Sequence, residues 1–128
     1  MFPFTGTAVT GCRGCDGCSK AQQCVRATGK DGVNTWLQKT LEADCILLAT
    51  PTHFCNVSVE MKSYIDRIGW ICCRNHALKN KIGASIITCG TSGQVGALDA
   101  VCPFIISYFN FLHLNCIHYL DQPFLWNL

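Results

Sequence analysis

The run Asp44-Cys-Ile-Leu-Leu-Ala-Thr50 is a short, continuous apolar stretch with a polar first residue. Runs of this kind are typical of strands that are buried on both faces of a parallel sheet. Pro51 follows directly, and we expect it to end the strand because proline cannot donate a hydrogen bond to a neighbouring strand. A loop over residues 52–56 and a helix over about residues 57–72 should come next.

The expected helix over residues 57–72 is amphipathic. Its apolar residues recur at intervals of three and four, as one face of a helix requires. This face consists of Val57, Met61, Tyr64, Ile65, Ile68 and Cys72. Lys62, Asp66 and Arg67 lie mostly opposite, and we interpret them as a solvated face with a surface ion pair.

The alternation of strands and helices continues in both directions. Upstream, Asp31 or Asn34 can cap a helix that runs to about residue 43. Downstream we expect a buried strand at 81–89, a glycine-rich loop at 90–96, an apolar helix at about 98–112 and a strand at 114–120. This order indicates an α/β fold with a parallel sheet.

Two loops follow the expected strands, and ligands bind at this edge of parallel α/β sheets. They consist of Pro51, Thr52, His53, Phe54, Cys55 and Asn56 in the first loop, and of Gly90, Thr91, Ser92, Gly93 and residues 94–96 in the second. Phe54 can stack on a flat ligand or fill core space. His53 can bind a ligand or face solvent, and Asn56 should also cap the next helix. The glycines admit a flat or anionic ligand, although tight turns alone would explain them equally well.

Four cysteines lie close together near the N-terminus: Cys12, Cys15, Cys18 and Cys24, in the spacing C-x2-C-x2-C-x5-C. Gly14 and Gly17 allow tight turns between them, because glycine tolerates positive φ. Four converging thiolates suit a [4Fe–4S] cluster. A zinc site with four thiolate ligands is the alternative, although such sites usually come as two separated pairs. A run that binds no metal is the third possibility.

The composition limits the class of protein. Of 128 residues, 49% are hydrophobic and 14% charged, and the net charge of +2 without a basic run gives no sign of nucleic-acid binding. Eleven cysteines, an odd number, argue against a secreted disulfide framework and favour a reducing cytoplasm. We expect the other seven to be small buried hydrophobes: Cys45, Cys55, Cys72, Cys73, Cys89, Cys102 and Cys116. Residues 101–120 are uncharged, but Pro103 and several polar residues favour a core helix and a strand over a membrane span.

The ordered set of motifs resembles the iron–sulfur flavoproteins, a branch of the flavodoxin-like NAD(P)H-dependent FMN reductase superfamily. Three stretches carry the resemblance. They are the cysteine run, the segment Leu41-Glu-Ala-Asp through Pro51-Thr-His-Phe-Cys-Asn to Asp66-Arg67, and the segment Leu78-Lys-Asn-Lys-Ile-Gly-Ala84 with the strand and glycine-rich loop after it. Together they cover roughly residues 10 to 120.

The resemblance implies a single flavodoxin-like domain over residues 1–128, with three α/β/α layers. It implies FMN as a cofactor, bordered by residues 51–56 and 90–93, beside a [4Fe–4S] cluster on the four cysteines. An electron donor such as ferredoxin or NAD(P)H and a homo-oligomer, a dimer or tetramer, are implied as partners. No nucleic acid and no membrane are expected.

The chain departs from the family at its start. The family opens with a strand and a Gly-Ser-Pro-Arg-like loop that holds the FMN phosphate, and no such segment precedes Cys12. Thr5-Gly-Thr7 is only a faint likeness. We therefore expect an N-terminally truncated, partial domain. The alternative function is that of a non-catalytic relic or a zinc-binding module of the same fold.

Overall fold

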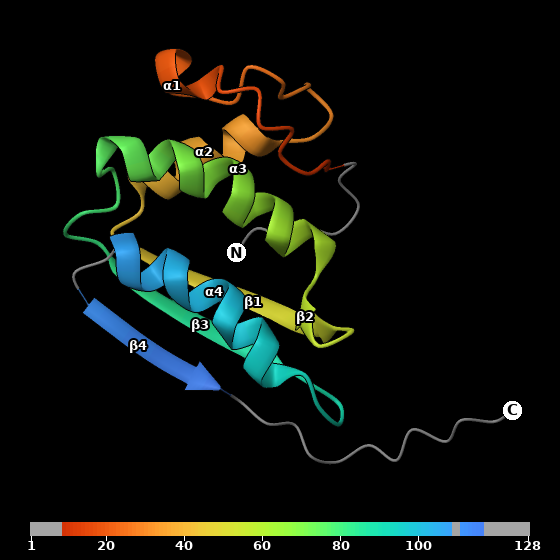
Figure 1. Ribbon diagram of the computed structural model, residues 1–128. Coiled ribbons are helices and arrows are strands. Elements are labelled where there is room, and N and C mark those ends of the chain that lie inside the picture. Colours follow the sequence, from red (N-terminus) through yellow and green to blue (C-terminus); the bar gives the residue numbers. More distant parts are fainter. Residues whose placement is uncertain (1–8, 109–110, 117–128) are drawn as a thin grey trace, which may run out of the picture.

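The computed structural model describes residues 9–108 and 111–116, which form an α/β structure (Figure 1). Its sheet has the strand order β2-β1-β3-β4. The strands are β1 (Cys45–His53), β2 (Asn56–Val57), β3 (Ile82–Thr88) and β4 (Phe111–Cys116). The pairs β1–β3 and β3–β4 are parallel, whereas β2 is antiparallel to β1. The predicted α/β class with its parallel strands is confirmed.

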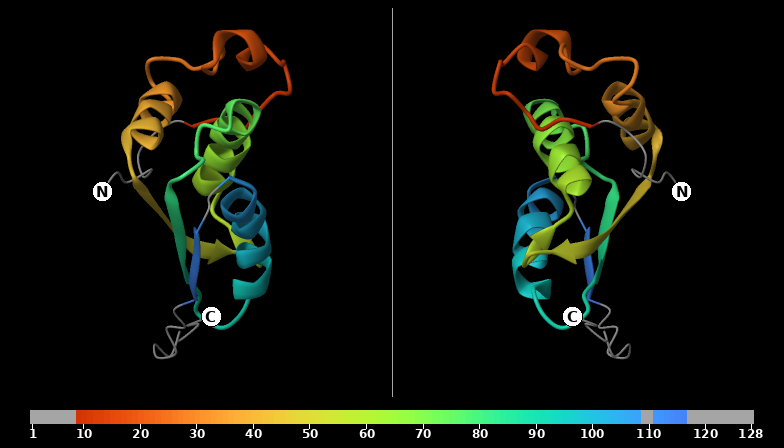
Figure 2. Two further views of the ribbon diagram at one scale, coloured as in Figure 1. Left: turned by 90° about the vertical axis from the view of Figure 1, so that its left-hand side faces the viewer. Right: turned by 90° about the vertical axis from the view of Figure 1, so that its right-hand side faces the viewer.

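The helices are α1 (Cys18–Ala21), α2 (Val33–Glu42), α3 (Val59–Asn75) and α4 (Gln94–Tyr108). The two edge-on views show α3 and α4 on the same side of β3 and β4 (Figure 2). The other face of β1 and β3 is open in the described part of the chain, where Leu47 is 56% and Ile82 is 50% exposed. The prediction that residues 44–50 are buried on both faces is therefore wrong. The described residues form two of the three expected layers.

The end of β1 also differs from the prediction. Pro51 does not end the strand, which continues to His53 and turns back as a hairpin into β2. The two turn residues, Phe54 and Cys55, have φ values of 46° and 63°. Positive φ at both central residues is the signature of a type I′ hairpin, whose twist matches that of the strands. Pro51 is tolerated because one edge of β1 is largely unpaired. In the described chain, only the two-residue β2 pairs with this edge.

Helix α3 begins at Val59, two residues after the predicted start at about residue 57. Its N-cap is Ser58, whose Oγ accepts a hydrogen bond from the Met61 N–H at 3.3 Å. Asn56, the predicted cap, lies in β2, where its Oδ1 accepts from the Val57 N–H at 2.8 Å. Helix α4 starts four residues earlier than expected and β4 starts three residues earlier. The predicted end of that strand, residues 117–120, lies outside the described residues.

Tyr64 joins the three long helices. Thr40 of α2 donates to the Trp36 carbonyl at 2.8 Å, so its Oγ1 accepts from the Tyr64 hydroxyl at 2.7 Å. The Tyr64 ring meets Phe104 of α4 edge-on, with ring centroids 6.1 Å apart. Burial raises the pKa of Tyr64 to about 12. The apolar face predicted for the helix is confirmed, except that Val57 is buried from β2 and Ile65 is only partly buried.

The remaining predictions on burial are confirmed in part. Cys72 and Cys89 are buried as expected, whereas Cys45 and Cys55 are exposed. Cys45 lies on the open face of β1, and Cys55 at the tip of the hairpin.

Among the described residues, no helix is long and apolar enough to cross a membrane.

The open sheet face can be tested with two adjacent leucines. Leu48 is 4% exposed, so Leu48→Ala should lower the free energy of unfolding by about 2–5 kcal/mol, through lost burial and the cavity left behind. Leu47→Ala should cost less than about 1 kcal/mol, because that side chain is already half in water. Urea unfolding of both variants measures the difference. Equal costs would mean that the face of Leu47 is covered in solution.

Candidate functional site

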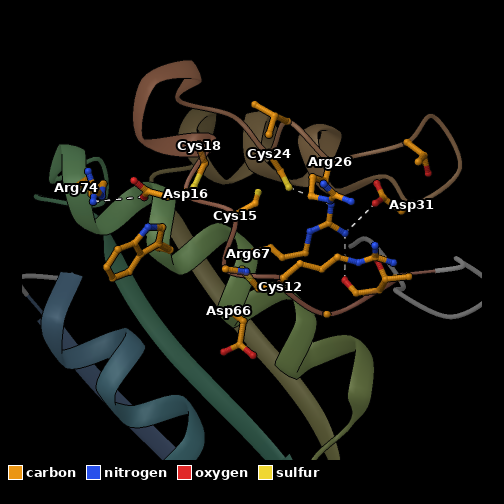
Figure 3. Close-up of a pocket in the computed structure, with 17 residues that line it drawn as sticks. Cys12, Cys15, Asp16, Cys18, Cys24, Arg26, Asp31, Asp66, Arg67 and Arg74 are labelled. Carbon is orange, nitrogen blue, oxygen red and sulfur yellow. Dashed lines mark hydrogen bonds and ion pairs between the residues drawn. The ribbon is translucent and has the colours of Figure 1, made fainter.

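A pocket of about 930 Å³ lies between the cysteine run and α3. All four cysteines of the run line it, and Figure 3 shows Arg67 of α3 reaching Cys24 and Arg74 reaching Asp16. Further lining residues are Arg13, Asp16, Arg26, Asp31, Asp66 and Trp70. Cys12, Cys15, Cys18 and Cys24 therefore line one pocket, and their convergence on a metal cluster stays a prediction.

The turns between the cysteines arise in a different way than expected. Gly14 has the predicted positive φ, at 63°, but Gly17 has a helical φ of −60°. The other left-handed residues in the run are Asp16 and Gln22, each with φ 53°. Gly17 packs closely on Val25, because a Cβ there would lie 2.4 Å from Cγ2 of Val25 unless that side chain moved.

Cys24 is held through its backbone by α2. The Cys24 N–H donates to Asn34 Oδ1 at 2.9 Å, and Asn34 Nδ2 donates to the Cys24 carbonyl at 3.1 Å. Asn34 therefore does not cap α2, and the alternative that named it as the cap is wrong. The N-cap is Gly32, and Asp31 beside it accepts from the Val33 N–H at 3.2 Å. The first turn of α2 thereby fixes the position of Cys24.

Arg67 holds the same cysteine through its sulfur. Its Nη2 donates to Cys24 Sγ at 3.1 Å, while its Nη1 donates to Asp31 Oδ2 at 2.8 Å and to the Thr10 carbonyl at 3.1 Å. The side chains of Arg67 and Asp31 are only 3% and 4% exposed. The interpretation of Arg67 as part of a solvated face is wrong, although Lys62 and Asp66 do form the expected surface ion pair.

The guanidinium of Arg67 remains charged in this environment. Burial lowers its pKa, but the hydrogen bonds to Cys24 and Asp31 outweigh that effect and leave the pKa raised. A buried ion pair of this kind persists only where hydrogen bonds satisfy both partners. Here the acceptors come from residue 10, from the cysteine run and from the residue before the N-cap of α2.

The four cysteines differ in their surroundings. Cys18 and Cys24 are partly buried and pack against the hydrophobic core, whereas Cys12 and Cys15 are exposed. Burial is the main reason that the pKa of the Cys18 thiol is raised. Cys12 Sγ accepts a weak hydrogen bond from the Gly14 N–H at 3.5 Å. The ten cysteines whose side chains the structure describes, all except Cys116, are free thiols.

The donors at the pocket are not arranged around a single ion. Zinc needs its thiolates at about 2.3 Å from one point. Among the described residues, no three His, Cys, Asp or Glu side chains converge in that way. In a [4Fe–4S] cluster each thiolate binds a different iron, so the four sulfurs surround a larger body. N–H groups pointing at Cys12 and Cys24 suit sulfur atoms that carry negative charge.

The two predicted ligand loops touch each other at the carboxyl ends of β1 and β3. A Cβ at Gly96 would lie 2.1 Å from the Cys55 carbonyl oxygen, and one at Gly93 would lie 2.7 Å from Cys55 Cα. Gly93 also has a φ of 97°. These glycines therefore serve a close backbone contact between the loops. Phe54 is fully exposed at the hairpin tip, which excludes the alternative that it fills core space.

The two candidate sites are separate within one chain. No residue of the hairpin or of the glycine-rich loop lines the cysteine pocket. Figure 1 shows the cysteine run beyond α3, on the opposite side of that helix from α4 and the sheet.

Comparison with known proteins matches residues 12–122 to the model of the NADPH-dependent FMN reductase family. The chain belongs to this family. An iron–sulfur flavoprotein of Archaeoglobus fulgidus is 38% identical over 79 residues, which are 62% of this chain and 37% of that protein. An iron–sulfur flavoprotein of Methanosarcina thermophila is 31% identical over 95 residues, which are 73% of this chain and 48% of that protein. The resemblance to iron–sulfur flavoproteins is confirmed.

The family model covers most of this chain, but the chain covers only part of its curated relatives. The chain spans less than half the length of the curated relatives given above, at 37% and 48%. It contains the cysteine run and both ligand loops. That residues 51–56 and 90–93 border a flavin, and that the cysteines hold a cluster, stay predictions at this point.

Sequence reasoning missed the network of Asp31, Asn34 and Arg67. The sequence predicted Asp31 and Asn34 as alternative helix caps and Arg67 as a surface charge. A signal was present in α3, where Ser63, Arg67 and Ile71 follow one another at helical spacing beside the apolar face. All three are buried. The helix is covered on two sides, and its second side lies against the cysteine run.

The contact between the two loops can be tested at its glycines. Gly96→Ala should gain about 1 kcal/mol in helix propensity. The clash with the Cys55 carbonyl should cost more, because a backbone atom cannot rotate away, and overpacking costs about 1–3 kcal/mol. Gly90→Ala is the control, since a Cβ there meets nothing within 4 Å. Thermal unfolding of both variants gives the comparison, and a Gly96→Ala protein as stable as the control would contradict the close contact.

Proposed function

We propose that this protein is an FMN-dependent redox protein that carries FMN and a [4Fe–4S] cluster and transfers electrons. The observation that carries the proposal is the gathering of Cys12, Cys15, Cys18 and Cys24 at one pocket, in a chain of the FMN reductase family. The names of its relatives, iron–sulfur flavoproteins, support the same pair of cofactors.

Each group of residues has a distinct part in this proposal. When bound, FMN supplies two-electron chemistry and the cluster supplies single-electron transfer. The four thiolates hold the cluster, and the N–H groups of Gly14 and Arg67 offset negative charge on two of the sulfurs. Residues 51–56 and 90–93 border the flavin ring. Phe54 offers its exposed ring for stacking, and the open backbone of Gly90 allows close approach.

The proposed partners follow from the same reasoning. The electron donor is NAD(P)H or a carrier such as ferredoxin. We propose a homo-oligomer, because the cysteines and the flavin loops lie apart within one chain and a second subunit would bring them together. The free thiols suit a reducing compartment, which we propose to be the cytoplasm.

A second candidate function is a relic or zinc-binding module of the same fold. Under this alternative the domain keeps its cysteines but does not hold FMN. Cofactor content separates the two candidates directly.

The cluster can be tested by anaerobic purification followed by visible spectroscopy and quantitation of iron, sulfide and flavin. We expect about four irons per chain, as a cubane cluster requires. Cys15→Ser should abolish the broad visible absorption and leave the flavin in place. Cys45→Ser is the control, because Cys45 is exposed but lies outside the pocket. Zinc without iron would support the second candidate, and an unchanged spectrum in Cys15→Ser would contradict the cluster.

The flavin loops can be tested at Phe54. Because its side chain is fully exposed, Phe54→Ala should leave the free energy of unfolding within about 0.5 kcal/mol of the wild type. It should weaken FMN binding by about two- to tenfold if the ring stacks on the flavin, since such contacts contribute about 0.5–1.5 kcal/mol. Fluorescence titration with FMN measures the affinity. Val59→Ala, another exposed apolar residue near the hairpin, is the control, and equal affinities in all three proteins would argue against stacking.

A further inference from the structure

We propose that Arg67, held by Asp31, is a positioning residue that orients Cys24 and raises the reduction potential of the cluster. This inference rests on the proposed function, since it requires a [4Fe–4S] cluster on the four cysteines. It assigns a role to a buried side chain that the sequence marks only as part of a polar helix face.

The first argument is geometric. Cys24 is fixed from two helices, because Asn34 of α2 holds its backbone and Arg67 of α3 donates to its sulfur. Arg67 has little freedom of its own, since Asp31 and the Thr10 carbonyl bind its other terminal nitrogen. The sulfur of Cys24 therefore meets a donor that is already in position before any metal binds.

The second argument is electrostatic. Adding an electron to a cluster makes it more negative, so N–H donors and positive charge near its sulfurs stabilise the reduced form and raise the potential. Arg67 provides both at 3.1 Å from Cys24 Sγ, in a site shielded from water. Asp31 offsets part of this charge, but it binds Nη1, whereas the sulfur is bound by Nη2.

The other arginines at the pocket act differently. Arg74 is 45% exposed and pairs with Asp16 at 3.5 Å. Arg13 and Arg26 are exposed as well. Water and salt screen charges in such positions, so their effect on a cluster should be small. Arg74→Gln is therefore a matched control for the loss of one arginine at the same pocket.

The test is a redox titration of the full-length protein, purified anaerobically with its cluster and followed by electron paramagnetic resonance. Arg67→Gln should shift the cluster midpoint potential to a more negative value, because the charge is lost. Asp31→Asn should shift it to a more positive value, because a nearby negative charge is lost while the amide oxygen can still accept one of the two hydrogen bonds. Arg67→Lys, which keeps the charge, should remain closer to the wild type, and Arg74→Gln should be unchanged.

Opposite shifts from the two partners are the decisive result, because a merely structural role would not produce them. If Arg67→Gln does not retain its cluster, Asp31→Asn and Arg67→Lys decide the question by the same titration. Unchanged potentials in the cluster-loaded variants, or shifts in one direction only, would overturn this proposal and leave the proposed function intact. A wild-type protein without iron and sulfide would overturn the proposed function, and this proposal with it.

Discussion

Arg67, buried in an ion pair with Asp31, connects the helical layer of the molecule to the cysteine run through its hydrogen bond to Cys24. A guanidinium shielded from water must have its N–H groups bound by acceptors, and leaving one partner unpaired would cost about 3–5 kcal/mol. The acceptors for Arg67 lie 36 to 57 residues before it in the sequence. The position of the run over α3, and with it the pocket between them, depends on this pair.

The contact between the two predicted ligand loops depends on a close approach of backbones instead of on charge. The hairpin after β1 can lie against the start of α4 only because Gly93 and Gly96 have no side chains. Parallel pairing of β1 with β3 brings the two loops to the same edge of the sheet. The cysteine pocket and the loop edge are thus built by different forces. They lie apart in one chain, which is why a subunit partner belongs to the proposed mechanism.

Much of the fold could be predicted from local sequence, and the errors have identifiable causes. The apolar face of α3 was correct because helical spacing directly determines which side chains share a side. Pro51 was wrongly taken as a strand end, because a proline is acceptable where one edge of the strand is largely unpaired. Burial of both faces of residues 44–50 was also wrong. Whether a strand face is covered depends on elements elsewhere in the chain.

The sequence by itself determined the family, the alternation of strands and helices, and the compact run of four cysteines, because these follow from residue type and spacing alone. Only the tertiary structure decided that Arg67 is buried, that Asn34 holds Cys24 and that Gly96 meets Cys55. The physical reason is that an arginine on a helix has the same local pattern whether it faces water or an acceptor. Its role is set by the segments that fold against it, and those contacts span 36 to 57 residues of sequence.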